Sequence, residues 1–334
     1  MKCNICVVGE AWGAEEAKHR TPFIGWMSRM LNPMLDEAGI SRADCLLTNV
    51  FNLLYNGKTE IFCGPKRTAI SGYGHLTKGY VQEEFQPELD RLRAEITETQ
   101  PNIIIAMGNA ALWAFSGHAA ISKYRGATFL STHTVPGVKV LPTYHPAAVM
   151  HQYELRPTVV FDLMKAAREA EYPEVRRPKA DIYIPETIED LHDFQAKFIR
   201  DFLSIDIETS GNHITCIGFA PSSEVGLVIP FVGSRANRNY WNSATDERHA
   251  WGFVRGLVEA KDIKKLFQNG LYDVSFLWRA YGIMAANCEH DTMLLHHALQ
   301  PEALKGLGYL GSIYTDHGPW KHLHARGSTI KRDN

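Results

Sequence analysis

The most constraining feature of this sequence is a series of short apolar runs in its first half. They have no polar face, and they cover residues 3–8, 46–50, 102–107 and 138–142. Strands that are apolar on both faces are typical of parallel sheets covered on both sides. Helix-like segments alternate with them, at residues 24–38, 83–99, 109–116 and 157–170. The first half therefore predicts an α/β fold, a three-layer αβα arrangement around a mostly parallel sheet.

The second half has a different order of elements. Residues 171–181 include two prolines and mixed charge, which is typical of a linker. Strand candidates then follow one another at 202–207, 213–219 and 225–230, before a strand and helices between 247 and 299. This order predicts a mixed-sheet α/β domain over residues 182–322. We therefore expect domains at 1–170 and 182–322, a linker between them, and a disordered tail at 323–334.

Composition excludes several classes of protein. Hydrophobic residues make up 45% of the 334 residues, enough for two cores. The net charge of −2 disfavours a purely electrostatic nucleic-acid binder. No apolar run reaches about 18 residues, so we expect no membrane span. Met1 and Lys2 lead directly into a strand, which predicts no signal peptide and a cytoplasmic protein.

The cysteines offer one metal hypothesis. Cys3 and Cys6 form a C-x-x-C, but in a strand their side chains point to opposite faces. We therefore favour buried strand cysteines. The alternative is an iron–sulfur site built from Cys3, Cys6, Cys45 and Cys63.

Polar segments follow the apolar runs of the first half. They lie at residues 9–13, 48–50, 108–109 and 143–146. Because ligands bind at the carboxyl ends of strands in such sheets, these segments are expected to face one cleft. Residues 52–80 have little periodicity and are predicted to form a long, functional loop.

Three stretches of the first half carry a resemblance to a known family. They are Gly-Glu-x-x-Gly at 9–13, Arg-Thr-Pro-Phe-Ile-Gly at 20–25 and Tyr-His-Pro at 144–146. In this order they resemble the uracil-DNA glycosylase superfamily, and within it the bacterial and archaeal iron–sulfur group. The resemblance covers residues 1–170 and implies that the domain binds DNA and excises or recognises uracil.

The resemblance implies roles for five residues. Such an enzyme flips its base out of the stack, and Phe23 would stack on that base. Asn49 would pair with the edge of uracil, with Gly9 among the substrate-binding residues. Glu10 would orient a water or stabilise charge on the sugar, and His145 would donate to the uracil oxygen.

The same resemblance assigns the segment 147–150 to a loop that enters the minor groove, with Met150 as an apolar wedge. The sequence departs from the family at Trp12, where proline is usual, and at His151, where arginine is frequent. The cluster cysteines ahead of the first strand are missing, so no iron–sulfur cluster is expected. A degenerate domain that only binds uracil is therefore a second interpretation.

The second half carries a pair of carboxylates. Asp206 and Glu208 are two residues apart in a strand and therefore share one face. Two negative charges at such a short separation are stabilised by a cation between them. Carboxylate oxygens are ligands that suit Mg²⁺ or Mn²⁺.

With Asn-x-x-Tyr-Asp at 269–273, this strand resembles the 3′–5′ exonucleases of family A DNA polymerases, whose domains are ribonuclease H-like. The resemblance implies that Asp206, Glu208 and Asp273 bind the metal and are catalytic. It implies that Asn269 and Tyr272 position the primer 3′ end.

The third exonuclease motif, a Tyr followed four residues later by Asp, is missing at Tyr309 and Tyr314. The domain is therefore interpreted as incomplete. Asp291, which begins a helix, is interpreted as its cap.

Together the two resemblances predict a hydrolase that acts on DNA, the N-terminal part of a phage-type family A DNA polymerase. Its partners would be uracil-containing DNA or a primer 3′ end, with a polymerase domain or subunit, and no membrane. The alternative is a non-catalytic DNA- or uracil-binding module that tethers or completes a split polymerase.

Overall fold

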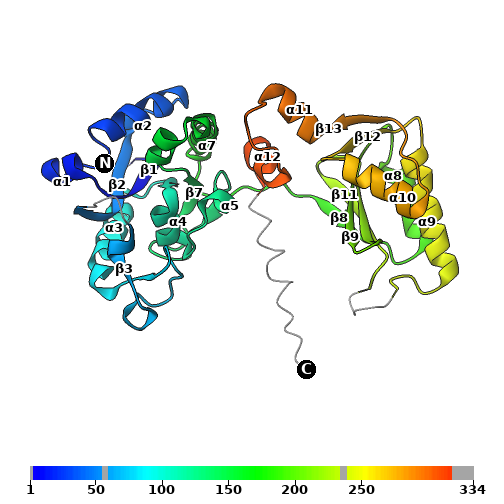
Figure 1. Cartoon of the computed structure of the whole chain (residues 1–334), viewed down its shortest axis with the longest axis horizontal. Helices are drawn as coiled ribbons and strands as arrows, with labels where there is room; N and C mark the ends of the chain where they lie inside the picture. The colour runs from blue at the N-terminus through cyan, green and yellow to red at the C-terminus, as the bar shows by residue number, and fades with distance from the viewer. Residues whose placement is uncertain (1–2, 55–58, 234–238, 318–334) are drawn as a thin grey trace. The chain divides into compact units, whose positions relative to one another are not determined.

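The computed structural model describes residues 3–54, 59–233 and 239–317. The chain divides into two compact units (Figure 1). The first comprises Met1–Arg177 together with the segment from Gly308 onward, and the second is Pro178–Leu307. None of the described helices is both long enough and apolar enough to cross a membrane.

The first unit is built on a five-stranded sheet. In spatial order its strands are β2 (Cys45–Leu54), β1 (Ile5–Trp12), β5 (Ile103–Met107), β7 (Lys139–Thr143) and β6 (Phe129–Leu130). The pairs β1–β2, β1–β5 and β5–β7 are parallel, which confirms the prediction. The antiparallel edge strand β6 was not predicted, because two residues carry too little periodicity.

Helices cover both faces of this sheet. Alternation along β1 sends Cys6 and Val8 into one core and Val7 into the other. The first core is closed by α3 (Gln86–Thr99) and α4 (Gly108–Ser116). The second is closed by α2 (Trp26–Glu37) and α7 (Arg156–Glu169). The predicted three-layer αβα arrangement is confirmed.

Shorter helices complete the unit. They are α1 (Ala14–His19), α5 (Ile121–Tyr124) and α6 (Pro146–His151). Helix α2 continues through Pro33, so the break that this proline could have caused does not occur.

The segment 52–80 is more ordered than the loop that was expected. It contains 3-10 turns at Thr59–Phe62 and Lys66–Thr68, and β3 (Cys63–Gly64) pairs with β4 (Tyr80–Val81). Its apolar side chains Phe62, Ile70 and Leu76 are buried in the first core. Packing therefore fixes this segment where periodicity gave no signal. Residues 55–58 lie outside the described part of the chain.

The second unit has a six-stranded mixed sheet. In spatial order its strands are β13 (Cys288–Asp291), β12 (Lys264–Phe267), β9 (Phe202–Ser210), β10 (His213–Ala220), β11 (Val225–Pro230) and β8 (Asp181–Tyr183). The strands β9, β10 and β11 are antiparallel neighbours, and β12 is parallel to β9. The mixed-sheet prediction is confirmed, although β8 and β13 were not predicted.

The helices described in this unit are α8 (Ile188–Phe198), α9 (Ala244–Glu259), α10 (Leu271–Tyr281) and α11 (Thr292–Leu299). The core takes Leu203, Ile205 and Ile207 from β9. The alternate residues of β9 are exposed or half-buried, so this strand is buried on one face only.

The last described helix, α12 (Leu307–Tyr314), packs on the first unit, whereas the predicted second domain extended to residue 322. Its Tyr309 hydroxyl lies 2.8 Å from that of Thr158, and Lys165 donates to the carbonyl of Thr315 at 2.8 Å. These polar partners on α7 hold α12, and no sequence pattern predicts them. The predicted tail at 323–334 lies outside the described residues.

Candidate functional site

The carboxyl end of β1 brings three predicted residues together. Gly9 is paired in register with Asn49 of β2. A Cβ atom at Gly9 would lie 2.2 Å from Oδ1 of Asn49 and 2.8 Å from Cζ of Phe23. Only glycine fits there, and its missing side chain is what allows Asn49 and Phe23 to meet above the strand.

Asn49 carries an unpaired donor. Its side chain is 2% exposed, and its Nδ2 has no hydrogen-bond partner among the described residues. Its backbone is fixed from outside the strand, since Nη2 of Arg91 donates to the Asn49 carbonyl at 2.8 Å. Leaving a buried donor unpaired costs about 1–3 kcal/mol, so the amide has the properties of a group that a ligand completes.

Phe23 is held in a strained conformation beside that amide. Its φ of 53° lies in the left-handed region, and its ring is 1% exposed. Its backbone N–H donates to Oε1 of Glu16 at 2.5 Å, and its carbonyl accepts from Nη2 of Arg42 at 2.8 Å. Neither partner was predicted, because no sequence pattern links Glu16 or Arg42 to Phe23.

Glu16 ties the loop between β1 and Phe23 at both ends. Its second oxygen accepts the backbone N–H of Gly13 at 2.7 Å. Burial raises the pKa of this carboxyl, against the two N–H groups that lower it. The carboxyl therefore orders the loop that carries Phe23.

Two other residues of β1 lie at this edge. Thr59 donates its hydroxyl to Oε1 of Glu10 at 2.6 Å. The indole N–H of Trp12 is buried and has no partner among the described residues. Glu10, the predicted water-orienting residue, is thus next to Gly9 in the strand and anchored to the segment 52–80.

His145 enters from β7. It caps α6, and its Nδ1 accepts the backbone N–H of Ala147 at 3.2 Å. Burial lowers the pKa of His145 to about 4. Its ring centroid is 6.3 Å from that of Phe23. The imidazole is therefore neutral at pH 7 and, because Nδ1 accepts, its proton is on Nε2.

The predicted minor-groove loop has a different structure. Residues 147–150 belong to α6, because Pro146 begins a helix that His145 caps. Val149 is fully buried, and Met150 is 50% exposed. Met150 is thus the one apolar side chain of this turn presented at the surface, but on a helix and not on a loop.

The carboxylates of the second unit lie at one end of β9. Asp206 and Glu208 share its exposed face, and burial together with Glu208 raises the pKa of Asp206. Asp273 is 4% exposed and accepts the backbone N–H of Ile207 at 3.1 Å. Burial, and then the charge of Asp206, raise the pKa of Asp273 to about 6.

The strand-positioning candidates surround them. The Tyr272 hydroxyl lies 2.7 Å from that of Thr209. Asn269 has a φ of 59° and donates its backbone N–H to Asp291 at 3.1 Å. Asp291 also accepts the N–H of Met293 at 2.8 Å, which confirms that it caps α11.

Within the ranges that the structure describes, no group of three His, Cys, Asp or Glu side chains is arranged to hold a metal ion. The expected ligand set Asp206, Glu208 and Asp273 is therefore not gathered in one group. Asp273 is bonded instead to the backbone of β9.

Comparison with known proteins adds three findings for the first unit. The family model of the uracil DNA glycosylase superfamily matches residues 1–167. A type-4 uracil-DNA glycosylase of Archaeoglobus fulgidus is 29% identical over 169 residues, covering 49% of this chain and 75% of that protein. One from Sulfurisphaera tokodaii is 29% identical over 170 residues, covering 49% and 69%.

A DNA polymerase of Bacillus phage SP01 is 25% identical over 245 residues, covering 64% of this chain but 26% of the polymerase. That alignment reaches beyond the part matched by the family model. Among solved structures, Brucella melitensis NrnC with bound Mg²⁺ has a TM-score of 0.29 and 17% identity, covering 43% of this chain and 64% of that chain. Escherichia coli RNase D, an exoribonuclease, has a TM-score of 0.30 and 13% identity, covering 40% and 33%.

Proposed function

Because the chain belongs to the uracil DNA glycosylase superfamily, we propose that it is a hydrolase acting on DNA whose first unit excises uracil. The site lies at the carboxyl ends of β1, β2 and β7. The observation that carries the proposal is the buried Nδ2 of Asn49, which has no hydrogen-bond partner in the described part of the chain and lies beside the ring of Phe23.

Base recognition follows from these two side chains. A flipped pyrimidine stacks on an aromatic ring, and Phe23 is fixed for that purpose at both its N–H and its carbonyl. An amide donates and accepts at once, so Asn49 matches the adjacent carbonyl and N–H of uracil. Cytosine has an amino group at the position of that carbonyl and would leave the Nδ2 donor facing another donor.

His145 would act on the leaving base. As the bond between base and sugar breaks, negative charge collects on the uracil oxygen. A neutral imidazole with its proton on Nε2 stabilises that charge by donating a hydrogen bond to the oxygen. The bond from Ala147 to Nδ1 fixes both the tautomer and the direction of the ring.

Glu10 would serve the sugar side of the reaction. A carboxylate there orients a water for attack on the anomeric carbon, or stabilises the positive charge that develops on the sugar. The hydroxyl of Thr59 donates to Oε1 of Glu10 and restricts the rotamer of this carboxylate.

The second unit carries a second candidate function, a 3′–5′ exonuclease. The observation that favours it is the placement of Asp206 and Glu208 on one face of β9, with Asp273 bonded to the backbone of the same strand. Burial, and then the neighbouring carboxylates, raise the pKa of Asp206 and of Asp273, and a bound cation would stabilise their charged forms. Asp206 would hold the ion with Asp273 and Glu208, and a bound Mg²⁺ or Mn²⁺ would activate a water for attack on the terminal phosphodiester. Tyr272, which is half exposed, would contact the strand end.

We propose further that the two units act together in a phage-type replication and repair protein, with a polymerase domain or subunit as partner. The alignment with the phage polymerase supports this. The alternative, a module that binds uracil-containing DNA without catalysis, draws on Trp12 and on the missing third exonuclease motif.

Two substitutions separate these functions. Glu10→Gln is expected to abolish uracil excision, measured in EDTA, and to leave 3′ degradation in Mg²⁺ unchanged. Asp206→Ala is expected to do the reverse. If both activities fall in both variants, the assignment of one activity to each unit is wrong. If neither activity is present while uracil-containing DNA binds, the non-catalytic alternative holds.

A further inference from the structure

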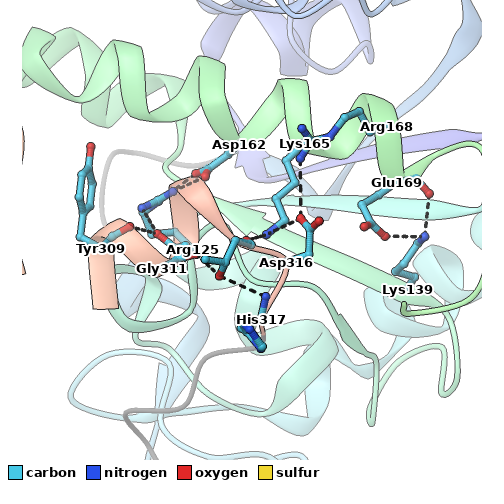
Figure 2. A network of polar contacts seen from close by, with 12 residues as sticks. Arg125, Lys139, Asp162, Lys165, Arg168, Glu169, Tyr309, Gly311, Asp316 and His317 are labelled. Atoms are coloured by element: carbon cyan, nitrogen blue, oxygen red, sulfur yellow. Dashed lines mark hydrogen bonds and ion pairs between the residues drawn. The ribbon is translucent and has the colours of Figure 1, made fainter. Parts of the chain in front are cut away.

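Helix α12 is anchored in the first unit by polar contacts that have no role in the proposed chemistry. Figure 2 shows Arg125 and Tyr309 near Asp162 and Lys165 of α7. Nη1 of Arg125 donates to the Ser312 hydroxyl at 2.8 Å. The Tyr309 hydroxyl contacts that of Thr158, and the Arg125 guanidinium lies 5.2 Å from the centre of the Tyr309 ring. Lys165 binds the carbonyl of Thr315. A segment that comes after the second unit in the sequence therefore packs against α7 of the first unit.

The contact from Ser312 leads into a buried ion pair. Arg125 forms a two-pronged pair with Asp162 of α7, in which Nε lies 3.0 Å from Oδ2. The side chains are 3% and 1% exposed. A Cβ atom at Gly126 would lie 2.7 Å from Oδ1 of Asp162 and 3.3 Å from Cβ of Ser312, so the backbone approaches this pair as closely as glycine allows.

The ion pair in turn holds the end of β7. Oδ2 of Asp162 accepts the hydroxyl of Thr143 at 2.7 Å, and Thr143 is fully buried. The backbone N–H of Gly126 donates to the carbonyl of Pro142 at 2.8 Å. Thr143 is the last residue of β7, and His145 follows two positions later.

From this chain of contacts we infer that α12 is a positioning element for His145, acting through Ser312, Arg125, Asp162 and Thr143. A buried, bidentate guanidinium–carboxylate pair transmits displacement because neither partner can move without losing its bonds. Loss of the Ser312 contact leaves Arg125 one acceptor short and loosens the strand end. The expected effect on the excision rate rests on the proposed uracil excision. The expected effect on the order of the β7 end does not.

The first test does not depend on activity. In the full chain, amide hydrogen exchange is compared between the unaltered protein, Ser312→Ala and Ser116→Ala. Ser116 is the matched control. Its hydroxyl donates to the carbonyl of Leu112 in its own helix, as the Ser312 hydroxyl donates to the carbonyl of Tyr309. Ser312→Ala is expected to speed exchange over residues 143–151, which include the Ala147 amide bonded to His145, and to leave residues 45–54 of β2 unchanged. Unchanged exchange at 143–151, or an equal rise over both segments, would overturn the inference.

The second test uses excision kinetics. Ser312→Ala and Thr143→Val are expected to lower kcat about tenfold with KM unchanged, because small displacements of a positioned group act on the chemical step. In a His145→Ala background the same substitutions are expected to change the rate less than about twofold, since coupled residues are not additive. Equal losses in both backgrounds would mean that α12 does not act through His145. An unaltered protein that excises no uracil would defeat the proposed function, and hydrogen exchange would still decide the positioning role.

Discussion

Gly9 and Asn49 face each other across β1 and β2 with no room for a side chain between them. A Cβ atom on Gly9 would lie 2.2 Å from Oδ1 of Asn49, well inside van der Waals contact. The positions of the buried Asn49 amide and the adjacent Phe23 ring therefore depend on the absence of a side chain at Gly9.

Gly9→Ala is thus expected to displace Asn49 and Phe23 and to lower the uracil excision rate about a hundredfold or more, since misplacement of about 1 Å has such effects. Single-turnover excision from a uracil-containing oligonucleotide measures this. Gly218→Ala is the control, because the nearest atom to its Cβ is 3.8 Å away on another strand of the second unit. An alanine at residue 9 that excises normally would contradict the crowded geometry.

Glu16 is expected to be needed for the stability of the loop that presents Phe23. Glu16→Ala leaves the N–H groups of Gly13 and Phe23 without their acceptor, at a cost of roughly 2–4 kcal/mol in the free energy of unfolding. Urea denaturation measures the loss, with the exposed Glu98→Ala as control. A destabilisation no larger than that of the control would mean that water replaces the carboxylate.

His145 provides a pH dependence with a defined sign. Its pKa of about 4 is lower than the ordinary value of 6.5, so below pH 6.5 the unfolded chain binds a proton that the folded chain does not. The His145 contribution therefore makes folding stability fall as pH drops from about 6.5 to 4, by up to about 1.4 kcal/mol per pH unit. His145→Asn is expected to flatten this part of the curve.

The same property predicts catalysis by a neutral ring. The His145 imidazole resonance is expected to titrate near pH 4, and this group is expected to contribute no loss of excision rate between pH 8 and 5. An imidazole that titrates near 6.5 would mean that the ring is solvated and charged at mildly acidic pH, against the bonding described for it.

Much of the first site could be predicted from the sequence, because strand ends of a parallel sheet meet at one edge and glycine, phenylalanine, asparagine and histidine follow those ends. Glu16, Arg42 and Arg91 could not, since side-chain bonds to the backbone of other residues leave no pattern in the sequence. The return of α12 to the first unit was missed for the same reason. The fold class followed from periodicity, whereas two-residue strands such as β6 are too short to have any.

Asp273 is expected to destabilise the second unit at neutral pH. Its pKa of about 6 exceeds the ordinary 3.8, so its contribution to stability is present below pH 3.8 and is lost as the pH rises through 6. Asp273→Asn is therefore expected to raise the free energy of unfolding at pH 7.5 by about 1–2 kcal/mol, and to change it little at pH 4.

Divalent metal provides the complementary measurement. Mg²⁺ is expected to raise the melting temperature of the second unit's transition in the full chain, and Asp273→Asn is expected to remove that increase. Glu224→Ala, which changes an exposed carboxylate between β10 and β11, is the control and should keep it. A Mg²⁺ effect that survives Asp273→Asn would place the ion elsewhere.

The most direct test of the central claim uses one oligonucleotide with a single internal uracil and a 5′ label. It is incubated with the full chain in EDTA, treated with alkali and analysed for cleavage at the uracil, in parallel with Asn49→Ala. The account predicts cleavage at the uracil by the unaltered chain, and its loss of at least about a hundredfold in the variant. Cleavage that is equal in both, or absent from the unaltered chain while the oligonucleotide binds, would contradict excision by the Asn49 pocket.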